Sequence, residues 1–323
     1  MKPLTFTVLP IALIAACAAA LPGCVTKSTI HFMLERGSTN FRLARLEKAD
    51  LRGRRLAGTN FSGADLRGAD LTGADLTAAS FRSADLREAV LHKAVLVRSD
   101  FSGARLFRAD LTESDLTASR FAGADCMMTK MAAAVIRKSD FHDADLSGAV
   151  LPGADLEGSD FSGALLFGAD MSGVRLAGVK LGGAKLYFAV LRDADLKGAA
   201  LRGADLRNVN FGGADLREVS LAGTLLTGAN FTDADLRNAD LSGTNLDGVV
   251  FEIANLAGTD FSGADLSRAN LKRARLGGAK LAGARVHRKY RDFLLGQGAE
   301  ITGIVWTDGA PVPDRRSEKG PKQ

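Results

Sequence analysis

The stretch Ala64–Gly73 reads Ala-Asp-Leu-Arg-Gly-Ala-Asp-Leu-Thr-Gly, two copies of a five-residue unit placed end to end. The same phase, with a large apolar residue at every fifth position, runs unbroken from Phe41 to Val286 and makes 50 consecutive units. A small residue usually stands two positions before the large one, and glycine is the commonest residue two positions after it. A repeat of this regularity predicts a solenoid in which each unit occupies an equivalent place.

A spacing of five fits neither a continuous helix nor a continuous strand. An α-helix turns about 100° per residue, so large residues five apart would scatter around its surface. A strand alternates faces at every residue, so an odd period would place successive large residues on opposite faces. We therefore expect each unit to form one short extended segment and one turn, with the glycine-rich position at the corner.

Phenylalanine reveals a longer period. It takes the large apolar position at intervals of twenty residues, which predicts four units per turn of the coil. A second series keeps this spacing but is displaced by ten residues, or half a coil, before Phe261 returns to the first phase. The first series is Phe41, Phe61, Phe81, Phe101, Phe121, Phe141 and Phe161, and the second is Phe211, Phe231 and Phe251.

Residues 41–286 resemble the pentapeptide-repeat family, whose consensus of Ala-Asp-Leu-x-Gly they follow without insertion. The resemblance implies an all-β fold, a right-handed quadrilateral β-helix. In that solenoid the central Leu or Phe and the small residue two before it point inward, and the other three positions point outward. Four units per turn give about 12 coils. Arg54, a large charged residue at an inward position in the first coil, predicts that this end is irregular or open.

Both ends of a solenoid expose unpaired strand edges unless another segment covers them. We expect residues 24–40 to form a tether and a short helical N-terminal cap, the cap being residues 30–36. Residues 287–308 are expected to form a C-terminal cap that contains a short helix, with Trp306 as the residue that plugs the core. The polar tail, residues 309–323, is expected to be disordered.

Residues 1–23 have the features of an export signal, with Lys2 followed by a short apolar stretch. The run Leu21-Pro22-Gly23-Cys24 resembles a bacterial lipoprotein signal, which would make Cys24 the lipid-modified first residue of the mature chain. Cys17 is the alternative, since Ile14-Ala15-Ala16-Cys17 forms a competing box, and ordinary cleavage without lipid is a third reading. The prediction is export and lipid anchoring to a bacterial membrane, on its periplasmic or cell-surface side.

Positive charge is concentrated at the C-terminal end of the chain. Residues 271–323 hold 12 Lys and Arg against 5 Asp and Glu, whereas residues 1–270 hold 30 against 32. No catalytic, cofactor-binding or metal-binding constellation is predicted, because the four histidines lie on different sides or coils and phosphate-loop and nucleophile-elbow motifs are absent. We therefore expect a protein that is not an enzyme and needs no cofactor.

Two sets of outward residues depart from the repeat and are candidate binding sites. The first is an apolar stripe on one side of the coil, typical of a partner surface: Phe107, Met127, Leu165, Phe167, Tyr187, Phe188 and Leu225. The second is basic, runs round two coils and could bind an anion: Arg175, Lys180, Lys185, Arg192, Lys197, Arg202 and Arg207. Solubilising charge is the competing reading of the second set.

These observations favour an envelope lipoprotein that acts as a scaffold or spacer. Its partner would be an envelope protein or an anionic polymer, and a homodimer stays open. Nucleic acid is disfavoured because base-stacking aromatics do not alternate with the basic residues. The alternative comes from the resemblance: some pentapeptide-repeat proteins mimic DNA and protect a type II topoisomerase. That role implies a cytosolic protein with an acidic surface, which the export signal and the charge balance do not favour.

Overall fold

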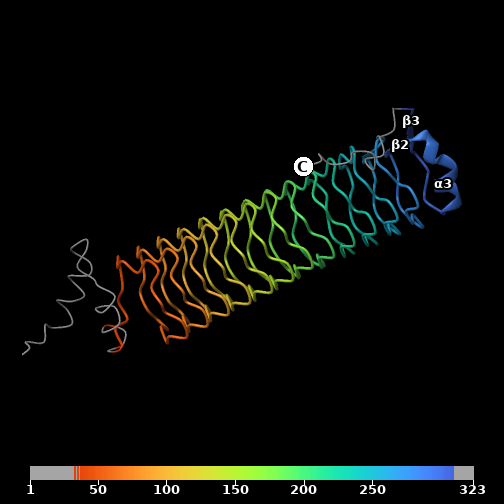
Figure 1. The fold of residues 1–323 in the computed structure, drawn as a ribbon. Helices are drawn as coiled ribbons and strands as arrows, with labels where there is room; N and C mark the ends of the chain where they lie inside the picture. The colour runs from red at the N-terminus through yellow and green to blue at the C-terminus, as the bar shows by residue number, and fades with distance from the viewer. Residues whose placement is uncertain (1–32, 34, 36, 309–323) are drawn as a thin grey trace, which may run out of the picture. The chain divides into compact units, whose positions relative to one another are not determined.

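The computed structural model describes Met33, Glu35 and residues 37–308. The chain divides into two compact units, Met1–Ala149 and Val150–Gln323. The boundary lies within the predicted repeat segment, and the five-residue pattern of the sequence continues through it. Each unit is a stack of similar coils (Figure 1).

One bridge and one turn build every pentapeptide. In the unit centred on Phe61, the Phe61 N–H donates to the Ser80 carbonyl at 2.7 Å, and the Ala64 N–H closes a turn on the Phe61 carbonyl at 2.9 Å. Asn60 pairs in parallel with Ser80, twenty residues later, and the same spacing recurs along both units. The predicted short extended segment, the turn and the four-unit coil are therefore confirmed.

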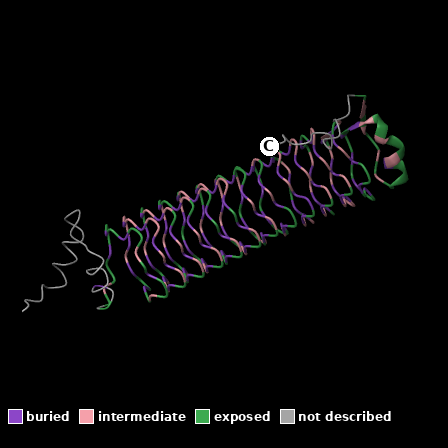
Figure 2. Ribbon diagram, in the orientation of Figure 1, coloured by how far each residue is buried: buried purple, intermediate pink, exposed green. Residues whose placement is uncertain are grey.

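The interior holds the two positions predicted to face inward (Figure 2). Leu66 and Ala64 are fully buried, and nearly all their equivalents are buried too. Hydroxyls at the small position donate to backbone carbonyls: Ser99 Oγ to the Leu96 oxygen three residues earlier at 2.6 Å, and Thr259 Oγ1 to the Leu236 oxygen of the preceding coil at 2.8 Å. These bonds remove the cost of burying an unpaired hydroxyl.

The phenylalanines stack as their spacing predicts. In the first unit, ring centroids are 4.6 Å apart for Phe81 and Phe101 and 4.4 Å apart for Phe121 and Phe141, with nearly parallel planes. In the second unit the displaced series stacks from Phe211 to Phe231 at 4.8 Å and on to Phe251. Each ring therefore packs on its equivalent in the next coil.

The outward aspartate of the repeat has a structural role that sequence reasoning missed. Asp70 Oδ1 accepts a hydrogen bond at 3.0 Å from the backbone N–H of Thr72, at the start of the turn. Asn60 does the same for Ser62. Aspartate and asparagine both offer a short side-chain acceptor for such a turn, which explains why they alternate at this position.

The named elements lie at the C-terminal end. Strand β1 (Asp265–Leu266) pairs in parallel with β2 (Arg285–His287), and β2 pairs with β3 (Val305–Thr307). Between β2 and β3 the 3-10 turn η1 (Arg288–Tyr290) leads into helix α3 (Arg291–Gly296) (Figure 1).

The residue that fills the core at this end differs from the predicted one. Leu294 of α3 is fully buried, whereas Trp306 is only partly buried in β3. The helix carries Leu294 inward, while Trp306 lies in the last described strand and pairs with Val286 alone. Leu294, not Trp306, is the core plug.

The backbone at Arg54 keeps the regular turn, its N–H donating to the Leu51 carbonyl at 3.3 Å, so the departure from the repeat predicted there is limited to the side chain. The Arg54 side chain is about one-third exposed and pairs with Glu35 at 3.1 Å, so the charge does not enter the core. Of the expected N-terminal cap, residues 30–36, only Met33 and Glu35 are described; both are helical, and Met33 is buried. The export signal, Cys17, Cys24 and the tail from 309 to 323 lie outside the described residues.

Candidate functional site: an aromatic patch

One side of the second unit carries outward apolar side chains where the repeat ordinarily has polar ones. This aromatic patch belongs to the pentapeptides centred on Leu166, Leu186 and Leu226. About half the surface of each large side chain is exposed for Phe167, Phe188 and Leu225. The members of the aromatic patch are Leu165, Phe167, Tyr187, Phe188 and Leu225.

The three rings form one cluster. The Tyr187 and Phe188 centroids are 4.2 Å apart, and Phe167 lies 5.8 Å from Tyr187 and 6.1 Å from Phe188, meeting the latter edge to face. Leu165 and Leu225 share a column with Lys185 and Asp205, since Leu165 bridges Lys185, Lys185 bridges Asp205 and Asp205 bridges Leu225. The structure therefore brings the second-unit members of the predicted stripe onto one side.

A fixed arginine borders the rings. The Arg207 guanidinium lies 5.3 Å from the Tyr187 ring centroid, a cation–π distance. Its Nε and Nη2 donate to the two carboxylate oxygens of Asp205 at 2.8 and 2.6 Å. The hydrogen bonds from Arg207 hold the pKa of Asp205 below its usual value, so this carboxylate stays charged and occupied.

Phe188 stands in an unfavourable backbone conformation. Its φ is +62°, at the second turn position that glycine usually takes in this repeat. A side chain in this left-handed region costs about 1–2 kcal/mol relative to the ordinary regions. Leu43 and Ile253 take the same turn position at positive φ, so this conformation is tolerated in the repeat and does not by itself mark Phe188 as a functional residue.

The first unit carries a smaller apolar group of its own. Phe107 and Met127 are partly buried, and the Arg108 guanidinium lies 5.0 Å from the Phe107 centroid. Met128, about half exposed at φ +55°, belongs with them although sequence analysis did not select it. Its place two positions after the large residue Cys126, where glycine is usual, was the available signal.

Comparison with known proteins identifies the family to which the repeats belong. A sequence profile of pentapeptide repeats matches residues 44–82, 74–112, 84–123, 139–178, 175–213, 214–252 and 254–288, which together make up well over half of the chain. The chain belongs to the pentapeptide-repeat family. Membership brings the right-handed quadrilateral β-helix that the resemblance implied.

Several solved pentapeptide-repeat structures are similar. HetL from the cyanobacterium Nostoc sp. strain PCC 7120, which is involved in regulating heterocyst differentiation, is 33% identical; the match covers 78% of this chain and 95% of HetL, with a TM-score of 0.36. QnrB1, a plasmid-mediated fluoroquinolone resistance protein, is 18% identical over 74% of this chain and 89% of its own, with a TM-score of 0.31.

A pentapeptide-repeat protein of the Arabidopsis thaliana thylakoid lumen is 27% identical over 42% of this chain and 83% of its own, with a TM-score of 0.23. No curated protein matches the sequence. Family membership rests on the repeat matches along the chain and not on these superpositions.

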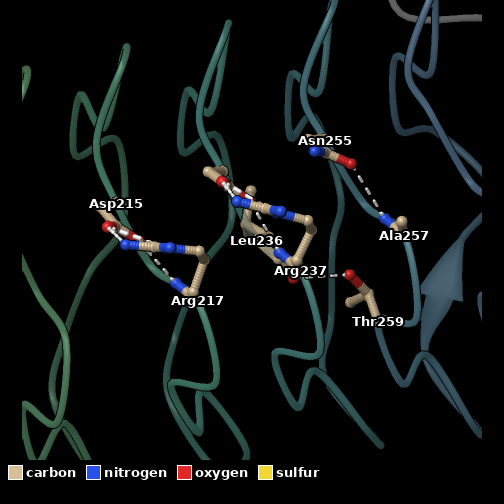
Figure 3. Close-up of polar contacts among 8 residues, drawn as sticks. Asp215, Arg217, Leu236, Arg237, Asn255, Ala257 and Thr259 are labelled. Atoms are coloured by element: carbon tan, nitrogen blue, oxygen red, sulfur yellow. Dashed lines mark hydrogen bonds and ion pairs between the residues drawn. The ribbon is translucent and has the colours of Figure 1, made fainter.

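Some outward aspartates of this pentapeptide-repeat chain are paired with an arginine two residues later. In the second unit, Arg217 folds back onto Asp215 and Arg237 onto Asp235, each through two nitrogens (Figure 3). We call this Asp-x-Arg arrangement a fork. Forks also join the pairs Asp50–Arg52, Asp65–Arg67, Asp85–Arg87 and Asp205–Arg207.

The seven residues of the basic set run round the coils and do not share a side. Arg175 pairs with Asp155 at 3.1 Å and Lys180 with Asp160 at 3.1 Å. Arg207 is held in its fork. Anion binding by the whole set stays a prediction, and the residues without an ion pair to another described residue are Lys185, Arg192, Lys197 and Arg202.

Pentapeptide repeats here offer little for catalysis. Among the described residues no group of three His, Cys, Asp or Glu side chains could hold a metal ion, and no helix there is long and apolar enough to cross a membrane. Cys126 is fully buried in the core, and burial raises the pKa of its thiol. A thiol held in its neutral form is a poor nucleophile, so Cys126 is a packing residue.

Proposed function

We propose that this pentapeptide-repeat protein is a non-enzymatic scaffold that binds another protein through the aromatic patch. The observation that carries the proposal is the exposed cluster of Phe167, Tyr187 and Phe188. Contiguous exposed aromatics are typical of interaction sites, where rings supply large contact area at small entropic cost. The short distances between the three ring centroids, 4.2 to 6.1 Å, support it, because a partner would meet the rings as one surface.

The proposal includes a place in the cell envelope. The lipoprotein-type sequence ending at Cys24, with Cys17 as the alternative, would tether the mature chain to a membrane. The first repeat begins at Phe41, so a short linker would separate the lipid from the solenoid. The aromatic patch would then be accessible to other proteins of the cell envelope.

DNA mimicry, and with it topoisomerase protection, is less well supported by the surface. A duplex mimic presents rows of unneutralised carboxylates. Here the arginine two residues after the aspartate occupies the carboxylate in every fork, as in Asp215 and Asp235.

Site-specific photo-crosslinking tests the proposed surface. Benzoylphenylalanine would replace Phe167 in one variant and Ile253 in another, with both chains expressed in the source organism. Ile253 is a matched control because it is exposed, sits at φ +55° in the same unit and lies on another side of the coil. We expect a discrete protein adduct from position 167 that is absent from position 253.

The variant Phe188→Gly sharpens the test. Glycine adopts positive φ without strain, so the fold should keep its thermal stability while the adduct at position 167 weakens. Equal adducts from both positions, or an adduct insensitive to Phe188→Gly in a folded chain, would contradict a docking role for the aromatic patch.

A further inference from the structure

The aromatic patch carries one charge that the fold leaves available. Lys185 lies in the column between Leu165 and Asp205, two residues before Tyr187 in the chain. It is exposed and forms no ion pair with another residue in the described part of the chain. Asp205, its neighbour in the next coil, is already engaged by both nitrogens of Arg207.

The coils that carry the aromatic patch have more basic than acidic residues, distributed over all four sides. Residues 175–207 hold seven Lys and Arg against three Asp and Glu. Arg192 and Arg202, which also lack an ion pair to a described residue, stand at the turns of the two adjacent sides. Lys185 on the patch side, and Arg192 and Arg202 on its two neighbouring sides, are therefore the cations nearest to the rings in position round the coil that no ion pair with a described residue neutralises.

We propose that the aromatic patch binds an acidic segment of a partner protein, which places an apolar side chain on Phe167 and Phe188 and a carboxylate on Lys185. This inference rests on the proposed function and adds the chemistry of the partner. Charge complementarity selects the ligand, because a carboxylate is the group that the lone ammonium lacks. A second copy of the chain is disfavoured, since a two-fold contact would bring two positive patches together.

The apolar side chains of the aromatic patch would supply binding affinity, and the charges around them would supply selectivity. The rings and the two leucines expose on the order of 400 Å² of apolar surface, about half of what one partner contributes to a standard interface. That area supplies an anchor for a short segment. Lys185 and the flanking arginines make the encounter faster and select against basic or neutral segments.

Selection from a phage-displayed library of random peptides tests the inference on the full chain. We expect the enriched peptides to combine Phe, Leu or Trp with Asp or Glu, and to lose affinity as salt rises. Lys185→Met keeps the apolar stem and removes the charge, and should weaken the enriched peptides about 5- to 10-fold. Lys185→Arg keeps the charge and should retain binding.

The variants separate failure of this inference from failure of the proposed function. One outcome would overturn the acidic partner and leave the docking surface standing. In that outcome the enriched peptides are neutral or basic, and their binding is weakened by a change at Phe188 but not by a change at Ile253 or by Lys185→Met. Enrichment that is the same on the Phe188→Gly variant would overturn both.

A membrane surface is the competing ligand, since aromatics beside lysine also suit anionic lipids. Flotation with phosphatidylglycerol vesicles, compared with phosphatidylcholine vesicles, addresses it with the Cys24→Ser and Cys17→Ser double variant, which lacks either acylation site. We expect no flotation that depends on Phe188. Flotation with phosphatidylglycerol that is lost in Phe188→Gly, together with no enriched peptide, would overturn the protein ligand.

Discussion

A single aspartate in the repeat serves two donors. Asp215 Oδ1 accepts from the Arg217 backbone N–H at 3.1 Å, which sets the turn, and its carboxylate also receives the Arg217 side chain (Figure 3). The hydrogen bond from the Arg217 side chain is the main reason that the pKa of Asp215 lies below 3.8, its usual value. The fork therefore couples local geometry to charge.

Because of the forks, the free energy of unfolding is expected to fall as the pH is lowered. A carboxyl group with a lowered folded pKa stabilises the chain above its unfolded pKa, and this contribution is lost as pH falls through the folded value. The Arg217→Gln variant removes one such contribution. We expect it to lower the free energy of unfolding at neutral pH by less than about 1 kcal/mol, because Asp215 and Arg217 are both partly exposed.

Denaturant unfolding at neutral pH and at about pH 2 checks this prediction. The difference between Arg217→Gln and the natural chain should narrow toward about pH 2, because protonation of the Asp215 carboxylate removes the charge that Arg217 pairs with. Arg192→Gln is the control, since Arg192 forms no ion pair with another described residue. A difference that persists unchanged in acid would show that Arg217 acts through packing instead of charge.

Sequence reasoning succeeded where one residue type has one role. Leu66 and Ala64 are large and small members of a fixed period, and burial follows from that period alone. It missed the turn acceptor of Asp70, since outward aspartates also fit a merely solvated surface. The ring cluster of Phe167, Tyr187 and Phe188 was predicted as a stripe, but the fork that fixes Arg207 against Tyr187 needed coordinates.

At the scale of elements, the C-terminal segment supplies a hydrogen-bond acceptor for the last coil where the repeat no longer provides a backbone carbonyl. In a regular coil the central residue donates its N–H to the carbonyl nineteen positions later, as Phe251 does to Asn270 at 2.8 Å. For Leu271 that position falls at Tyr290, in η1. The Tyr290 hydroxyl accepts the Leu271 N–H at 3.1 Å in place of a carbonyl.

This substitution of a side chain for a backbone partner can be tested with Tyr290→Phe. The change leaves the buried N–H of Leu271 without its acceptor and should cost about 1 kcal/mol of unfolding free energy. Hydrogen exchange at the Leu271 amide should accelerate at the same time. The control is Tyr187→Phe, whose hydroxyl bonds no other described residue; equal effects of the two changes would contradict the role given to Tyr290.

The helix itself could be foreseen only in outline. Tyr290, Phe293 and Leu294 recur at helical spacing, and α3 covers the latter two. Which of Leu294 and Trp306 enters the core depends on where the chain re-enters the coil after the helix. That path is a tertiary property, and the larger aromatic was the wrong choice because strand pairing with Val286 holds Trp306 at the edge.

At the scale of the whole molecule, the predicted anchor determines which partners the chain can meet. Intact mass and membrane fractionation of the natural chain, Cys24→Ser and Cys17→Ser address it directly. We expect a lipid-sized mass increment and membrane association that only Cys24→Ser abolishes, because the thioether link forms on that sulfur. A soluble, full-length product from the natural chain would contradict the envelope location and make topoisomerase binding the next assay.

Pairing at intervals of twenty residues has a consequence for how such a chain can change its length. Loss of twenty residues within one unit removes a whole coil, and every later bridge, such as Asn210 with Asn230, finds an equivalent partner. Loss of five keeps the interior intact but turns all later residues by one side of the square. Duplication or deletion of five residues would therefore move a docking surface to another side of the coil without disturbing the fold.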